Sequence, residues 1–126
     1  MTGKHKSISG FSLVGSGSAI PEQLITNDQL ASRVDTNDEW ITTRTGIRQR
    51  RVIGPDESFS QLCSNAAASA LEMARWHAES LDLILVATST PDDLFGAAPR
   101  IQAKIGANHA VAFDVTAACS GFLFAL

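Results

Sequence analysis

Positive charge is scarce in this chain of 126 residues. Ten Lys and Arg are outnumbered by 13 Asp and Glu, which gives a net charge of −3 at pH 7. Proteins that bind a nucleic-acid backbone carry an excess of basic residues, so this balance argues against DNA or RNA as a partner. Charged residues make up 18% of the sequence, below the roughly 25% of an average soluble domain, whereas hydrophobic residues make up 44%. A chain with this composition is expected to fold.

Long apolar runs and cysteines are also few. The longest apolar runs, 83–87 and 121–126, fall far below the roughly 18 residues that a membrane span requires. We therefore expect no membrane segment, and no apolar core follows the basic residues near the N-terminus to form a signal peptide. Two cysteines and three histidines, at these spacings, predict neither a disulfide scaffold nor a metal site. These absences favour a reduced, cytoplasmic protein.

Three capping-box motifs predict helix N-termini. In each, a Thr or Ser that can cap a helix is followed three residues later by Gln or Glu, and the cap residues are Thr26, Thr36 and Ser58. The first two introduce short helices, which should end near Val34 and at Gly46. The third introduces the clearest amphipathic helix, about 59–77, whose alanines would allow it to lie close to a sheet.

Helices and strands alternate in the second half of the chain, and two further strands are predicted in the first half. Strands are predicted at 7–15, 49–53, 83–88 and 111–115, the last two as apolar runs typical of buried parallel strands. Further helices are predicted near 97–105 and from about Cys119. From residue 59 onward the order is therefore helix, strand, helix, strand, helix, which indicates an α/β fold with a parallel sheet and right-handed crossovers.

Cys119 is the best candidate for a nucleophile. Three small residues follow the predicted strand 111–115, and Cys119 comes next, in the first turn of a predicted helix. Unpaired backbone N–H groups and the helix dipole would stabilise a thiolate there and could also hold an oxyanion. The site would lie beyond the carboxyl end of a parallel strand, where open α/β sheets bind their ligands. An alternative is that Cys119 is a small buried core residue.

No histidine is placed to serve as a partner for that thiol. His5 is in the N-terminal tail, and His77 is at the C-terminus of the predicted long helix. His109 precedes a strand that spans about 20 Å at roughly 3.3 Å per residue, so it is expected at the opposite end of the sheet from Cys119. Because a cysteine nucleophile needs a base or an orienting group, we expect part of the catalytic machinery to be missing from this chain.

Trp40 and Arg44 are one helical turn apart, so both are expected on one face of their helix. An indole beside a guanidinium suits a ligand that has an aromatic base and phosphate groups. Spacing alone favours a simpler interpretation, a partly buried Trp beside a surface Arg. Arg48, Arg50 and Arg51 add a local basic cluster, which could contact phosphates or an acidic carrier protein but is more often a solvated face.

Two segments resemble the β-ketoacyl-[acyl carrier protein] synthase III family. Residues 35–51, DTNDEWITTRTGIRQRR, are similar to an N-terminal signature of the family, and 112–122, AFDVTAACSGF, to the segment around its active cysteine. LVATSTP at 85–91 and IQA at 101–103 also match in order. The resemblance implies the thiolase fold, in which two similar α/β halves form five layers. It identifies residues 1–126 as the first half, truncated within the helix that begins near Cys119.

The resemblance also implies a reaction. Cys119 would accept an acyl group from acyl-CoA, with acetyl-CoA as the expected donor. Decarboxylation of malonyl-acyl carrier protein would then supply the carbanion that attacks this thioester. The products would be 3-oxoacyl-carrier protein, CO₂ and CoA, in the initiating step of type II fatty acid synthesis. CoA would enter as a thioester substrate, and no permanently bound cofactor is implied.

Further residues match the family by position. Trp40 matches the residue that stacks on the CoA adenine, Thr36 and Arg44 match CoA contacts, and Phe95 more weakly matches a residue that reaches the acyl pocket of the partner subunit in a homodimer. The family's catalytic His and Asn have no counterpart here, which implies that this chain alone is inactive. Two alternatives stay open: a related CoA-dependent acyltransferase or synthase of secondary metabolism, and a non-catalytic partner subunit.

Overall fold

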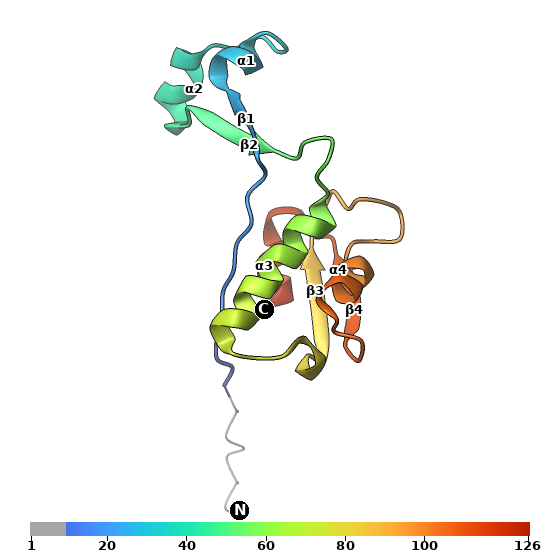
Figure 1. The fold of residues 1–126 in the computed structure, drawn as a ribbon. Helices are drawn as coiled ribbons and strands as arrows, with labels where there is room; N and C mark the ends of the chain where they lie inside the picture. Colours follow the sequence, from blue (N-terminus) through green and yellow to red (C-terminus); the bar gives the residue numbers. More distant parts are fainter. Residues whose placement is uncertain (1–9) are drawn as a thin grey trace, which may run out of the picture.

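The computed structural model describes residues 10–126, which form two lobes (Figure 1). The small lobe, residues 23–52, consists of β1 (Gln23–Thr26), α1 (Asn27–Ala31), α2 (Asp38–Thr45) and β2 (Gln49–Val52). The large lobe, residues 58–126, consists of α3 (Phe59–Ala74), η1 (Ala78–Ser80), β3 (Leu83–Ala87), α4 (Ala98–Ile105), β4 (Val111–Val115), η2 (Ala118–Ser120) and α5 (Gly121–Ala125), where η1 and η2 are 3-10 turns. This order confirms the predicted α/β class.

The large lobe is built on two parallel strands. β3 and β4 pair in register along their whole lengths, whereas β1 and β2 of the small lobe pair antiparallel. One face of the β3–β4 pair packs against α3 and α4 through a buried apolar cluster of Val86, Ala97, Ala98 and Ile101. On the other face α5 lies so close that a Cβ on Gly121 would be 3.1 Å from the Cβ of Ala87.

Polar side chains cap the N-termini of α1, α2 and α3, two of them where predicted. Thr26 forms the predicted capping box with the Gln three residues later, and Ser58 accepts a hydrogen bond from the third backbone N–H of α3. The remaining prediction is wrong by one residue. Asn37, rather than Thr36, caps α2 by accepting from the N–H of Trp40 at 2.8 Å. Asn is a slightly better cap than Thr, so local propensity explains the shift.

A carboxylate from a distant loop also caps α3. The two carboxylate oxygens of Asp92 accept from the backbone N–H groups of Phe59 and Ser60, both at 2.9 Å. Burial tends to raise the pKa of Asp92, but the hydrogen bonds from Ser60 and Phe59 outweigh it and lower the pKa below its ordinary value. The negative charge also interacts favourably with the helix N-terminus. Asp92 therefore ties the loop after β3 to the start of α3.

The predicted strand 7–15 is not formed in its described part. Residues 7–9 lie outside the described residues, and 10–15 run as extended chain beside α3 (Figure 1). The backbone groups of α3 are already hydrogen-bonded within the helix, so this neighbour cannot pair with a strand. The segment instead approaches the helix closely through its glycines. A Cβ on Gly15 would be 2.3 Å from Ala70 O, and one on Gly17 would be 2.0 Å from Ala66 O.

Three helix boundaries also differ from prediction. α3 ends at Ala74 and not at residue 77, because Arg75 adopts a left-handed conformation with φ of 57°. α1 ends at Ala31, before the predicted residue 34. The helix expected to begin near Cys119 begins at Gly121, since the preceding residues form the 3-10 turn η2.

We predict that Gly17→Ala destabilises the chain by about 2 kcal/mol, because the new methyl group would overlap the backbone of α3. Gly10→Ala is the matched control, since a Cβ there would meet nothing within 4 Å. Urea unfolding followed by circular dichroism gives both values. Equal stabilities of the two variants would show that residues 10–17 do not pack on α3 in solution.

We also predict that Asp92 makes the free energy of unfolding depend on pH in the acidic range. A carboxyl group whose pKa is lowered by folding stabilises the native state above its unfolded pKa of about 3.9. This stability is lost as the pH falls through the lower folded pKa. Because Asp92 is exposed, solvent screens its charge, so Asp92→Asn should cost no more than about 1 kcal/mol at pH 7. The difference from the wild type should shrink below about pH 4. Asp56→Asn, in an exposed turn, is the control, and a pH-independent difference for Asp92→Asn would contradict the prediction.

Candidate active site

Cys119 lies beyond the carboxyl end of the parallel strand pair. The Oγ1 of Thr116 donates to Thr88 O at 3.1 Å, and the N–H of Thr88 donates to Val115 O at 3.1 Å. These two bonds tie together the chain segments that leave β3 and β4. Cys119 follows in η2, and its thiol side chain is exposed. The position is the one at which parallel α/β sheets present reactive groups to ligands.

The backbone just before Cys119 is strained. Ala118 adopts a left-handed conformation with φ of 43°, which is unfavourable for a residue with a Cβ. Ala117 has φ of −145° and ψ of 30°, so the chain turns sharply between β4 and α5. Strain of this kind costs on the order of 1 kcal/mol and gathers at functional sites. The run of small residues was the only sign of this turn in the sequence.

Two of the backbone donors near Cys119 are already used. The N–H of Ser120 donates to Ala117 O at 2.9 Å, and the N–H of Gly121 donates to Ala118 O. They are therefore not free to bind an oxyanion, contrary to the simplest expectation for a helix start. Stabilisation of a thioester oxyanion has to involve other groups.

Cys63 provides a contrast to Cys119. It is partly buried in α3 and packs against the apolar cluster of the large lobe. Burial raises the pKa of the Cys63 thiol, and the negative charges of Asp92 and Asp114 raise it further. Cys63 is therefore held as a neutral thiol, with no feature of a nucleophile.

Trp40 and Arg44 form an exposed shelf on α2. The guanidinium carbon of Arg44 lies 4.4 Å from the centroid of the Trp40 ring, a cation–π arrangement. Arg44 Nη1 also donates to Trp40 O at 3.3 Å, which holds the side chain over the helix. The indole remains 52% exposed. With Asn37, Glu39 and Thr43 it lines a shallow depression of about 280 Å³.

Two arginines near this shelf donate hydrogen bonds to other parts of the chain. Arg50 Nη2 donates to Asn27 Oδ1 at 2.7 Å, and Arg51 Nη1 donates to Glu22 O at 2.6 Å. Arg50 is half-buried and supports the small lobe through Asn27, whereas Arg48 and Arg51 are exposed, as expected of a solvated face. The Oγ1 of Thr36 is shielded from solvent and has no hydrogen-bond partner among the described residues.

Phe95 lies at the tip of the loop between β3 and α4. Its side chain is 90% exposed, and its N–H donates to Asp93 Oδ1 at 2.8 Å. Asp93 also forms an ion pair with Arg100 of α4. Asp114 of β4 accepts from the first backbone N–H groups of α4 at 2.7 and 2.8 Å. The carboxylates of Asp93 and Asp114 thus fix the loop between β3 and α4. In the sequence, the acidic residues of this loop indicated no more than loop polarity.

The structure does not bring all these residues together. Trp40 and Arg44 lie in the small lobe, Cys119 and Phe95 in the large lobe (Figure 1). Within residues 10–126, no helix is long and apolar enough to cross a membrane, and no group of His, Cys, Asp and Glu is arranged to hold a metal ion.

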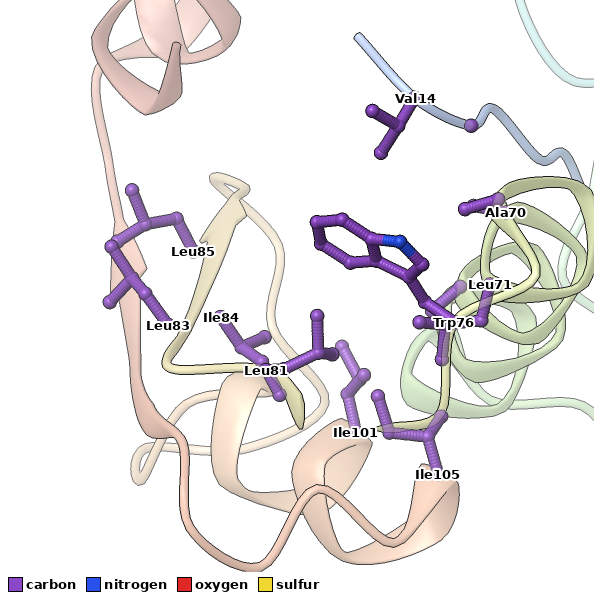
Figure 2. Close-up of a pocket in the computed structure, with 13 residues that line it drawn as sticks. Val14, Ala70, Leu71, Trp76, Leu81, Leu83, Ile84, Leu85, Ile101 and Ile105 are labelled. Carbon is purple, nitrogen blue, oxygen red and sulfur yellow. The ribbon is translucent and has the colours of Figure 1, made fainter. Parts of the chain in front are cut away.

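A cavity lined by apolar side chains lies elsewhere in the large lobe. It measures about 320 Å³ and lies between Val14, Trp76 of the α3–η1 connection, and Leu85 of β3 (Figure 2). Ile101 and Ile105 of α4 close one side. The described residues that line it carry no titratable or nucleophilic group. It is therefore a gap in packing between residues 14–15 and β3, and not a reaction site.

Comparison with known proteins identifies close relatives. No protein-family model matches the chain. It is 65% identical over all 126 residues to a β-ketoacyl-[acyl-carrier-protein] synthase III of Prochlorococcus marinus, of which it covers 37%. It is 62% identical over its whole length to the protein of the same name from a Synechococcus species, again covering 37%.

Solved structures agree with these relatives. The 3-oxoacyl-[acyl-carrier-protein] synthase III of Aquifex aeolicus matches 92% of this chain with a TM-score of 0.86 and 44% identity, and 38% of that protein is covered. The priming β-ketosynthase of the R1128 polyketide pathway matches 90% of the chain with a TM-score of 0.84 and 37% identity, and 34% of it is covered. The chain is therefore similar, in sequence and in its thiolase-like fold, to a part of these β-ketoacyl-[acyl-carrier-protein] synthase III proteins, and it spans about a third of their length.

Proposed function

We propose that this chain is the acyl-accepting part of a condensing enzyme that initiates type II fatty acid synthesis. The exposed thiol of Cys119, beyond the carboxyl ends of β3 and β4, carries the proposal, together with the 65% identity to a synthase III. Cys119 attacks the thioester carbonyl of an acyl-CoA such as acetyl-CoA, which releases CoA and leaves an acyl-cysteine. In this proposal the thiol proton passes to a base that residues 10–126 do not supply, because His77 and His109 precede β3 and β4 and lie at the opposite end of these strands from Cys119.

The second step of the proposal forms the new carbon–carbon bond. Malonyl-acyl carrier protein loses CO₂, and the resulting carbanion attacks the carbonyl of the acyl-cysteine. The thiolate of Cys119 then leaves, and the product is a 3-oxoacyl-carrier protein. The oxyanion needs donors other than the N–H groups of Ser120 and Gly121, which are engaged within the turn. In this proposal a His and an Asn, expected from the family resemblance and absent here, supply them.

We further propose that Trp40 and Arg44 bind the nucleotide end of CoA. The exposed indole offers a stacking face for adenine, and the guanidinium beside it suits a phosphate. CoA is long, and its pantetheine arm separates the nucleotide from the thioester. One ligand can therefore engage a shelf in the small lobe and a thiol in the large lobe. Thr36, one residue before the α2 cap, belongs to this CoA site in the proposal.

The exposed loop tip suggests a role for Phe95 in the complete enzyme. We propose a cytoplasmic homodimer in which Phe95, with the equally exposed Leu94, packs into the acyl pocket of the other subunit. Burying two such side chains would supply apolar contact at an interface. CoA is a substrate in this proposal and not a resident cofactor.

A related synthase of secondary metabolism is the second candidate. The match to the priming β-ketosynthase of the R1128 polyketide pathway, at 37% identity and a TM-score of 0.84, favours it. The first candidate is preferred because the relatives at 62 and 65% identity are synthase III proteins.

The reaction can be tested in a chimera in which these 126 residues replace the matching residues of the 65% identical Prochlorococcus synthase. We predict condensation of acetyl-CoA with malonyl-acyl carrier protein. Cys119→Ser should lower kcat at least about 1,000-fold, because the nucleophile is lost. Cys63→Ser, the matched control, should retain activity within about two-fold. Retention of activity by Cys119→Ser would refute the proposed mechanism.

The two thiols should also differ in reactivity in the chain itself. We predict that iodoacetamide alkylates Cys119 readily at pH 8 because this side chain is exposed. Cys63 should react at least about ten-fold more slowly, because burial and the two nearby carboxylates raise its pKa above the ordinary value of about 8.5. Peptide mass mapping after timed quenching measures both rates. Equal rates in the folded chain would contradict this assignment.

A further inference from the structure

Asn27 is the most buried polar side chain of the small lobe, with 1% of its surface exposed. Its Nδ2 donates to Asp38 Oδ1 at 2.7 Å and to Ile47 O at 2.8 Å. Its Oδ1 accepts from Arg50 Nη2 at 2.7 Å. The same Nδ2 lies 3.4 Å from Thr42 Oγ1. One amide group therefore joins α1, α2, β2 and the turn between the last two.

The partners of Asn27 hold α2 at both ends. Asp38 is the first residue of α2, Thr42 lies in its middle, and Ile47 follows its C-cap. Thr42 Oγ1 also donates to Asp38 Oδ1 at 3.1 Å. The hydrogen bond from Asn27, and next that from Thr42, lower the pKa of Asp38 and keep it ionised. The inward face of α2 is thus fixed by a charged, hydrogen-bonded cluster.

The exposed shelf is on the opposite face of α2. At about 100° per residue, Trp40 and Arg44 are rotated by roughly 200° from Asp38 and Thr42. Apolar packing contributes little to holding this helix, because Ile41 is its one buried residue. In the small lobe Ile25 is the other buried apolar side chain. The orientation of the shelf therefore depends on the Asn27 cluster rather than on an apolar core.

We propose that Asn27 is a positioning residue for CoA, which fixes α2 so that Trp40 and Arg44 meet the nucleotide end of the ligand. This inference rests on the proposed function of the shelf. Asn27 does not itself touch the ligand, since it is buried behind α2. It acts through Asp38 and the turn at Ile47.

The test uses the whole 126-residue chain with Trp76→Phe, so that Trp40 is the only tryptophan. CoA is titrated while Trp40 fluorescence is recorded. Asn27→Asp keeps the shape of the side chain but replaces its N–H donors with oxygen, which would face Asp38 and Ile47 O. We expect CoA affinity to fall at least ten-fold. Asn65→Asp adds the same charge on the exposed side of α3 and should leave the affinity unchanged within two-fold.

A charge swap distinguishes positioning from general damage. In the double variant Asn27→Asp with Asp38→Asn, residue 38 can donate to residue 27, so the bond is restored with its direction reversed. Part of the lost affinity should return, because Ile47 O still faces an oxygen of residue 27 instead of an N–H donor. Thr42→Val is a milder variant that removes one hydroxyl of the cluster, and it should lower affinity by a few-fold in a chain that stays folded.

A ligand-independent measurement separates the two proposals. The ¹⁵N indole resonance of Trp40 should shift in Asn27→Asp and move back toward its parent position in the double variant, whereas Asn65→Asp should not move it. If the parent chain shows no saturable response to CoA, the proposed CoA shelf is wrong. If the parent binds CoA but Asn27→Asp and Thr42→Val bind it equally well, or the double variant restores neither affinity nor resonance, the positioning role of Asn27 is overturned.

Discussion

The parallel pairing of β3 with β4 is the constraint on which the large lobe depends. Parallel strands cannot be joined by a tight turn, so the chain must return by a crossover, which here is α4. The carboxyl ends of both strands then meet at one edge of the sheet. There the bonds of Thr88 to Val115 and Thr116 hold the strand ends together, and the strained turn at Ala118 exposes Cys119. The position of the thiol follows from strand direction more than from any single neighbour.

The small lobe is held together by different interactions from those of the large lobe. It has few residues with which to form an apolar core, and Ile25 and Ile41 are its buried apolar side chains. Hydrogen bonds centred on Asn27 instead fix the helices of the small lobe. Such a cluster gives precise orientation, since each bond depends on direction, whereas apolar contact does not. The Trp40–Arg44 shelf on the outer face of α2 is held in orientation by this cluster.

Much of the fold could be predicted from the sequence, because strong local signals agreed with the tertiary structure. The cap at Thr26, the amphipathic pattern of α3 and the apolar run of β3 are of this kind. Residues 10–15 have a strand-like pattern but lie beside a helix, and pairing partners are invisible to local pattern. Nothing in the sequence pattern indicated the role of Asn27, because a single Asn after a cap residue has no periodicity. Its role exists only because Asp38 and Arg50 converge on it in space.

The sequence separations between the paired strands have a consequence for how the chain folds. Gln23 pairs with Val52 and Leu83 with Val111, separations of 29 and 28 residues. Loop-closure entropy grows only with the logarithm of this separation, so both pairings carry nearly the same entropic cost. Neither needs the other to be in place, and each is completed within a continuous stretch of the chain. Each lobe is thus suited to form as its own residues become available during synthesis, the Trp40–Arg44 shelf before the thiol.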